Sequence, residues 1–247
     1  MLSLELNINQ RLEPELIDLM RRKEDTFYKV VKNELAYADS IGWFDVSEWA
    51  CEDKIEHIEK LADKVRKDAD VFVLIGVGGS NNAARSVIEA LSEGEKPKII
   101  YAGNTLSPQA LRKVLKEIDE KSVYINCIAK NFETLEPGAS FRILRKYLYE
   151  KYGEEAKNRI IVTGTAGSSL DELCKKNRYE FLEFPLNIGG RYTAISNVGL
   201  LPMAVAGIDI REVVRGARDA QSTLHKAEPE NNSAYRYACL RNLLFSK

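Results

Sequence analysis

Three short segments hold the residues with the clearest chemical potential, and each follows an apolar run. They are GVGGSNN (76–82), AKNFETLEP (129–137) and PLNIGGRYTAIS (185–196). The first offers backbone amides and a serine hydroxyl at the start of a helix, where the helix dipole favours an anion. The other two contribute the cations Lys130 and Arg191. Together the segments predict a site for a phosphate or carboxylate group.

The glycine-rich turn has alternative interpretations. A dinucleotide-binding turn requires G-x-G-x-x-G, but Asn81 stands at the third glycine position. The second apolar run ends in Tyr101 and Ala102, without the acid that would bind a ribose. The pattern G-x-x-x-x-G-K-S/T of a P-loop does not occur in the sequence. A merely structural tight turn stays open, because glycine-rich turns from strand to helix are common.

The elements that must position these segments alternate along the chain. Short β-branched runs occupy 71–76, 98–103, 122–129, 159–164 and 179–185, and helical patterns lie near 81–92, 107–119, 137–152 and 168–177. Continuous apolar strands separated by helices are typical of a parallel sheet that is covered on both faces. The sequence therefore predicts an α/β fold with a doubly wound, five-stranded parallel sheet, in which ligands bind at the carboxyl ends of the strands.

Helical patterns flank this sheet on both sides. We expect an N-terminal helical segment over 1–68, an α/β domain over 69–206 and a helical segment over 207–247 that leads to a missing second domain. Within the first segment, Trp43 and Trp49 are interpreted as anchors of the helices. Caps are expected for two C-terminal helices, from Asp209 and from Asn231 or Asn232. The apolar stretch after Arg191 is too short to cross a membrane and predicts a buried helix.

Composition excludes several classes of function. The chain has 36 basic and 37 acidic residues, a formal charge of −1, so we expect no nucleic-acid partner and no membrane partner. Its 45% hydrophobic and 30% charged content is ordinary for a globular protein. The N-terminus carries acids from position 5 and no basic region before an apolar run, which predicts a cytoplasmic protein without a signal peptide.

Cysteine and histidine offer no metal or redox site in the sequence. The spacing of Cys51, Cys127, Cys174 and Cys239 suits reduced packing residues better than metal ligands or disulfides. His57 and His225 lie in charged helical stretches without a spaced partner, so we expect both to face solvent. No metal and no organic cofactor are expected.

Taken together, the three segments resemble the glucose-6-phosphate isomerase (phosphoglucose isomerase) family, whose amino-terminal half is a sugar isomerase domain. The most specific match is GGRYTAISNVGLLPMAVAGIDI, which is similar to the family's GGR signature and its continuation. IGVGGSNNAARSVIEAL, KNFETLEP with FRILRKYL, and ENNSAYRYACLRNLL also resemble that family. The resemblance covers roughly residues 65–247. It implies reversible conversion of glucose 6-phosphate to fructose 6-phosphate through an enediol, and a homodimer in the complete form.

The resemblance also implies roles for individual residues. Those expected to bind the hexose phosphate are Gly79, Ser80, Lys130, Asn131, Thr134, Glu136 and Gly190. Arg191 is expected to be catalytic, since a fixed guanidinium can stabilise the charge of an enediolate-like transition state. A structural salt bridge is the alternative for Arg191. For Glu136 the alternative is a structural role, in which its carboxylate interacts favourably with the dipole at the start of its helix.

The sequence departs from the family in its phosphate loop. Ala129 and Asn131 replace hydroxyl residues, and Glu133 stands where a threonine is usual. A carboxylate facing a phosphate dianion would cost on the order of a kcal/mol or more. We therefore expect either that Glu133 points away from the ligand or that the ligand differs from a standard hexose phosphate.

The second departure concerns proton transfer. Isomerisation needs a general base and a ring-opening acid, which the family takes from its second half, and neither maps onto this chain. The sequence thus predicts the first half of a longer enzyme, with an uncovered apolar helix face formed by Tyr237, Leu240, Leu243 and Leu244. Alone, such a chain would be poorly soluble or would pair with another polypeptide.

The alternative to an isomerase is a non-catalytic sugar-phosphate-binding or regulatory module. A half-domain that binds nothing is disfavoured, because it would not explain why three segments with ligand-binding residues are expected at one edge of the sheet.

Overall fold

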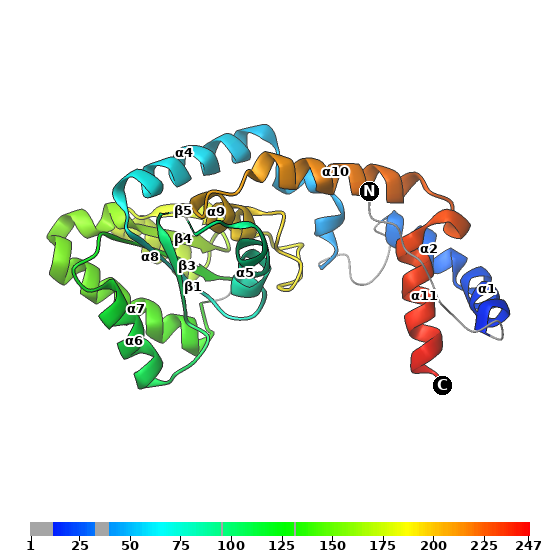
Figure 1. The fold of residues 1–247 in the computed structure, drawn as a ribbon, viewed down its shortest axis with the longest axis horizontal. Coiled ribbons are helices and arrows are strands. Elements are labelled where there is room, and N and C mark those ends of the chain that lie inside the picture. Colours follow the sequence, from blue (N-terminus) through cyan, green and yellow to red (C-terminus); the bar gives the residue numbers. More distant parts are fainter. Residues whose placement is uncertain (1–11, 33–39, 95, 131) are drawn as a thin grey trace.

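Five apolar segments form one parallel sheet in the computed structural model, which describes residues 12–32, 40–94, 96–130 and 132–247. The strands are β1 (Val71–Ile75), β2 (Lys98–Ala102), β3 (Val123–Ala129), β4 (Ile160–Gly164) and β5 (Glu180–Glu183), in the order β2-β1-β3-β4-β5. The predicted doubly wound sheet is confirmed. The chain runs outward from β1 to β2 and then crosses back to β3, so the strand order reverses between β1 and β3 (Figure 1).

Helices cover both faces because alternate strand residues point to opposite sides. Phe72 and Leu74 pack with α4 (Glu52–Asp68), α5 (Gly79–Leu91) and α9 (Asn197–Val205). Val73 and Ile75 pack on the other face with α6 (Pro108–Ile118), α7 (Leu135–Tyr152) and α8 (Ser169–Asn177). The expected helices are thus present, with α5 and α7 beginning two residues earlier than their apolar patterns indicated.

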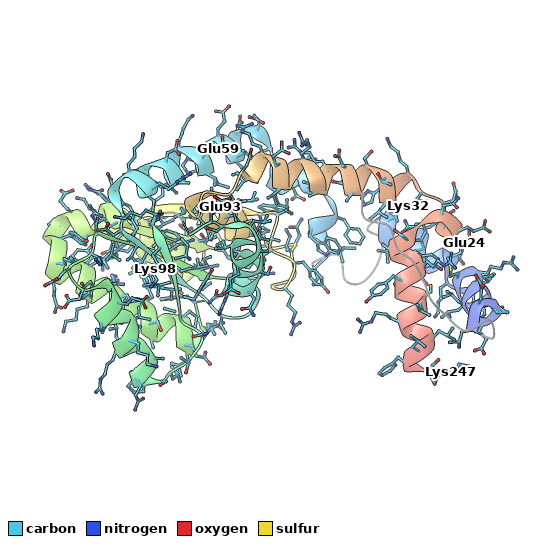
Figure 2. All side chains as sticks on the ribbon, in the orientation of Figure 1. Glu24, Lys32, Glu59, Glu93, Lys98 and Lys247 are labelled. Atoms are coloured by element: carbon cyan, nitrogen blue, oxygen red, sulfur yellow. The ribbon has the colours of Figure 1, made fainter. Side chains whose placement is uncertain are left out.

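A helical arm extends from this α/β body. In Figure 1, α10 (Ile210–Lys226) leads away from the sheet, and α11 (Ser233–Phe245), α1 (Leu12–Arg22) and α2 (Glu24–Val31) gather at its far end. Asp209 caps α10 and Asn232 caps α11, as the sequence predicts. Short turns complete the chain: η1 (Gly42–Phe44), α3 (Val46–Trp49), η2 (Gly153–Arg159) and η3 (Pro229–Asn231). Figure 2 places Lys247 at the end of this arm and Glu59 on the body.

The apolar face of α11 is only partly uncovered, which corrects the sequence-based expectation. Leu240 and Leu243 are buried against Leu16 of α1, whereas Tyr237 and Leu244 are exposed. The sequence could not show this contact, because more than 200 residues separate the two helices. None of the described helices has both the length and the apolar character needed to cross a membrane.

Candidate functional site

The three predicted segments meet at the carboxyl edge of the sheet, where the strand order reverses. Ile75 of β1 pairs in register with Cys127 of β3, so the turns that follow these two strands are neighbours. The segment after β5 crosses to them: the Lys130 ammonium donates hydrogen bonds to the carbonyls of Leu186 (2.9 Å) and Ile188 (3.0 Å). The segments thus converge at the edge where parallel topology predicts a ligand site.

The glycine turn and the Arg191 segment are in direct backbone contact. A Cβ placed on Gly79 would lie 1.6 Å from the Gly190 carbonyl oxygen and 2.9 Å from the Arg191 Cα. The Thr193 hydroxyl donates to the Gly79 carbonyl at 3.1 Å. Only a residue without a side chain allows this approach. The predicted ligand residues Gly79, Gly190 and Arg191 are therefore brought together.

The turn before α5 presents a helix start to the same edge. Gly78 adopts φ +59°, a conformation that favours glycine, and it precedes the first residue of α5. The Asn81 side-chain amide donates to the Gly76 carbonyl at 3.4 Å and closes the turn. Ser80 is half-buried, and its hydroxyl makes no hydrogen bond to another residue that the structure describes. That hydroxyl is free to donate to an anion.

Lys130 has a structural role that the sequence did not predict. Besides its two carbonyl acceptors, its ammonium lies 5.9 Å from the centre of the Phe184 ring. Two of its three N–H donors are therefore directed to the segment that carries Arg191. Lys130 thus ties the end of β3 to that segment. Its predicted contact with phosphate would use the third donor.

The start of α7 contributes the remaining predicted residues. Thr134 occupies the N-cap position, is exposed and makes no side-chain capping bond. Glu136, in the first turn, is half-buried and forms no ion pair within the described ranges. Glu133 is exposed, as Thr134 is, so the direction expected for its side chain stays a prediction. Asn131 lies outside the described residues.

The Arg191 side chain is exposed and, among the residues that the structure describes, it forms no ion pair and donates no hydrogen bond. The salt-bridge alternative therefore has no partner in this part of the chain. An unpaired guanidinium beside a helix start can serve a negatively charged ligand or transition state. Figure 1 shows its segment, in yellow between β5 and α9, passing beside α5.

The N-terminal segment takes part in the site, and sequence reasoning missed this. The Ser40 carbonyl accepts a hydrogen bond from the Gly189 amide (3.0 Å), and the Gly42 amide donates to the Asn187 carbonyl (2.7 Å). Trp49 is buried, as an anchor should be. Trp43 instead stacks on Tyr192, outside the helices that it was expected to anchor. The aromatic motif WFDVSEW was the only signal of this contact.

The histidines and cysteines form no cluster with the predicted site residues among the residues that the structure describes. His57 is exposed and lies 3.1 Å from a Glu180 carboxylate oxygen, and exposed His225 lies beside the Phe44 ring. Three cysteines are buried and all four are free, as expected of packing residues. Burial raises the pKa of the Cys174 thiol to about 11. Within the described ranges, no three His, Cys, Asp or Glu residues come together in a way that could hold a metal ion.

An apolar groove of about 1050 Å³ lies between the body and the arm. Its lining includes Phe27 of α2, Trp43 of η1, Leu224 of α10 and Leu243 of α11. The predicted site residues that the structure describes do not line it. The groove is therefore distinct from the polar edge, although Trp43 borders both features.

Comparison with known proteins matches most of the chain to one family. The family model described as phosphoglucose isomerase matches residues 54–244. A glucose-6-phosphate isomerase of Pediococcus pentosaceus is 41% identical over 86% of this chain and 50% of its own length, and one of Exiguobacterium sibiricum is 36% identical over 94% and 54%. The chain spans about half the length of these curated relatives.

Two crystal structures share the fold. A hypothetical protein of Thermus thermophilus superposes with a TM-score of 0.82 at 24% identity, covering 97% of this chain and 57% of the other. A glucose-6-phosphate isomerase of Chlamydia trachomatis gives 0.73 at 20% identity, covering 96% and 52%. These likenesses extend over the arm as well as the sheet. Because the family model covers most of its length, this chain belongs to the phosphoglucose isomerase family.

Proposed function

We propose that this chain supplies the sugar-phosphate and transition-state-stabilising half of an enzyme that interconverts glucose 6-phosphate and fructose 6-phosphate. The observation that carries the proposal is the unpaired Arg191 guanidinium, whose backbone lies against the Gly79 turn. The proton that leaves C2 of the aldose returns to C1, and the intermediate between them is an enediolate. A guanidinium beside its oxygens would stabilise this developing negative charge.

The binding half of the proposal assigns the phosphate to the carboxyl edge. Gly79 and Ser80 would donate from the start of α5, and Lys130, Asn131 and Thr134 from the loop after β3. Gly190 leaves the space in which the substrate approaches Arg191, and Glu136 would contact the sugar. No metal and no organic cofactor are required, because enediolate chemistry needs only acid, base and charge stabilisation.

The decisive experiment is an isomerase assay on the 247-residue chain and on the full product of its reading frame. We expect turnover in the longer protein, because this chain spans only about half the length of its curated relatives. Absence of activity in both proteins would refute the proposal.

A second candidate is a non-catalytic sugar-phosphate-binding or regulatory module, favoured by the altered loop with Ala129 and Glu133. Calorimetric titration with fructose 6-phosphate separates the two candidates. Heat of binding without turnover in the full product of the reading frame would favour the module, whereas binding with turnover favours the isomerase.

We further propose a cytoplasmic homodimer as the complete form, without nucleic-acid or membrane partners. The net charge of −1 provides no long-range attraction to polyanions. Exposed Tyr237 and Leu244 on α11 are suited to contact with further protein. Light scattering tests the assembly: a monodisperse monomer of the full product would contradict the homodimer.

A further inference from the structure

The segment that carries Arg191 contains two glycines, which favour a flexible backbone, and yet several hydrogen bonds hold it in place. Gly189 and Gly190 precede the arginine, and glycine loses more conformational freedom on ordering than any other residue. On one side Lys130 binds the carbonyls of Leu186 and Ile188. The segment is also bound by residues that precede the sheet by some thirty positions.

These earlier residues form a short clamp, which we define as Ser40–Trp43. Ser40 and Gly42 make backbone hydrogen bonds to Gly189 and Asn187, and Ile41 forms an antiparallel bridge with Ile188. The Trp43 ring then stacks on Tyr192, with ring centroids 5.2 Å apart and planes at 11°. The clamp thus contacts the Arg191 segment on both sides of the arginine.

Of the contacts that the clamp makes, the aromatic stack is the nearest to Arg191 along the chain, because Tyr192 directly follows the arginine. Trp43 is 40% exposed and packs edge-on against Phe44, with ring centroids 4.3 Å apart, whereas Tyr192 is 55% exposed. The Phe44 contact thus holds the Trp43 ring, and the more exposed Tyr192 ring is stacked on it. Stacked pairs of this kind contribute beyond their buried area.

We infer that Trp43 is a positioning residue for Arg191: its stack on Tyr192 fixes the backbone that aims the guanidinium at the ligand. The consequence for catalysis rests on the proposed isomerase function. The structural consequence does not, because an unclamped segment would open more often whether or not the chain is an enzyme. The two consequences require separate experiments.

Limited digestion with trypsin tests the structural consequence on the 247-residue chain. Trypsin cleaves after arginine, so the rate at the bond from Arg191 to Tyr192 reports how often the segment opens. We expect Trp43→Ala to raise that rate about two- to tenfold, the factor that corresponds to the loss of one aromatic pair. Trp43→Phe retains a ring and should restore slow cleavage. Tyr192→Ala, which removes the same stack from the other side, should match Trp43→Ala.

Leu91→Ala is the control, since Leu91 is an exposed apolar residue at the end of α5 with no part in the clamp. It should leave the cleavage rate unchanged. Equal rates in the parent chain, Trp43→Ala and Tyr192→Ala would overturn the inference.

A double-mutant cycle tests the catalytic consequence in the full product of the reading frame. Trp43→Ala should lower kcat about two- to tenfold with little change in KM, and Trp43→Phe should recover it. In an Arg191→Ala background, Trp43→Ala should lower kcat no further, because its effect passes through the arginine. Independent, multiplicative losses would overturn the positioning role. If the parent has no isomerase activity, the proposed function fails, and the trypsin result alone decides on the clamp.

Discussion

Gly79 packs directly on the Gly190 carbonyl, so that a methyl group on the Gly79 Cα would come within 1.6 Å of that oxygen. The first residue of α5 and the residue before Arg191 are therefore in backbone contact, although 111 positions separate them. Both sides of the contact are main chain, so rotation of a side chain could not relieve an added atom. This contact sets the distance between the backbone of the glycine turn and the backbone of Arg191.

Replacing Gly79 by alanine should force these two segments apart. We expect the free energy of unfolding to fall by about 1–3 kcal/mol, the usual consequence of overpacking, and activity of the full product of the reading frame to fall with it. Urea denaturation followed by circular dichroism measures the first effect. Gly216→Ala is the matched control: a Cβ there meets no atom within 4 Å, and alanine favours the α10 helix by about 1 kcal/mol. Equal stability changes in the two variants would contradict the contact.

Arg191→Ala should lower kcat about 10²- to 10³-fold in the full product of the reading frame, with a much smaller rise in KM, because its proposed work is in the transition state. Arg191→Lys should recover little, since an ammonium lacks the planar fork of a guanidinium. The thermal midpoint should stay unchanged, because the side chain is exposed and without a described partner. Equal kcat values for the parent and Arg191→Ala would refute the catalytic role.

The sheet and much of the edge could be predicted because they depend on local patterns. Continuous apolar runs define β1 to β5, and parallel topology brings their carboxyl ends to one edge whatever the loops contain. The caps from Asp209 and Asn232 are likewise local. The predicted neighbourhood of Gly79 and Arg191 followed from this topology, without knowledge of any contact.

What could not be predicted depends on contacts between distant segments. Leu240 is buried only because α1 packs against it. The Lys130 ammonium is oriented by two backbone carbonyls, and every residue has a carbonyl, so the sequence does not reveal which ones accept its hydrogen bonds. The stack of Trp43 on Tyr192 has the same origin, because an aromatic residue near the N-terminus can pack on many surfaces. The domain division after residue 68 stays a prediction.

Acid should lower the free energy of unfolding, in part through protonation of Asp171. The Lys175 ammonium and the Gly167 amide both donate to the same Asp171 carboxylate oxygen, each at 2.8 Å. These hydrogen bonds lower the pKa of the Asp171 carboxyl below its usual value, and the bond from Lys175 has the larger effect. A lowered folded-state pKa means that the stabilisation is fully present above the unfolded value of about 4 and is lost as the pH falls below it.

Urea denaturation across the acid range measures this effect. The stability difference between the parent chain and Asp171→Asn should be greatest near neutral pH and shrink below about pH 4. Asp63→Asn, at an exposed position on α4 with no hydrogen bond to another described residue, should follow the parent at every pH. A constant difference between the parent and Asp171→Asn over the whole range would contradict the assignment.

Lys130→Met distinguishes a structural lysine from a simple phosphate ligand. The variant keeps most of the apolar stem but removes both donors to the carbonyls of Leu186 and Ile188, of which Ile188 is buried. We expect the free energy of unfolding to fall by about 1–2 kcal/mol, because a carbonyl loses its partner and a glycine-containing segment loses its support. Lys64→Met, at an exposed lysine of α4 that makes no hydrogen bond with a described residue, should change stability little.

The same variant should also weaken binding of inorganic phosphate, measured by calorimetry, because Lys130 joins the phosphate loop to the segment that carries Arg191. Comparison of the two measurements separates the possible roles. Loss of phosphate affinity with an unchanged unfolding midpoint would show a ligand alone and contradict the tie between the segments. Loss of stability with unchanged phosphate affinity would show that Lys130 only connects the two segments and does not bind the phosphate. Loss of both is the expected result, since two of its donors bind the segment that carries Arg191 and the third remains available to the ligand.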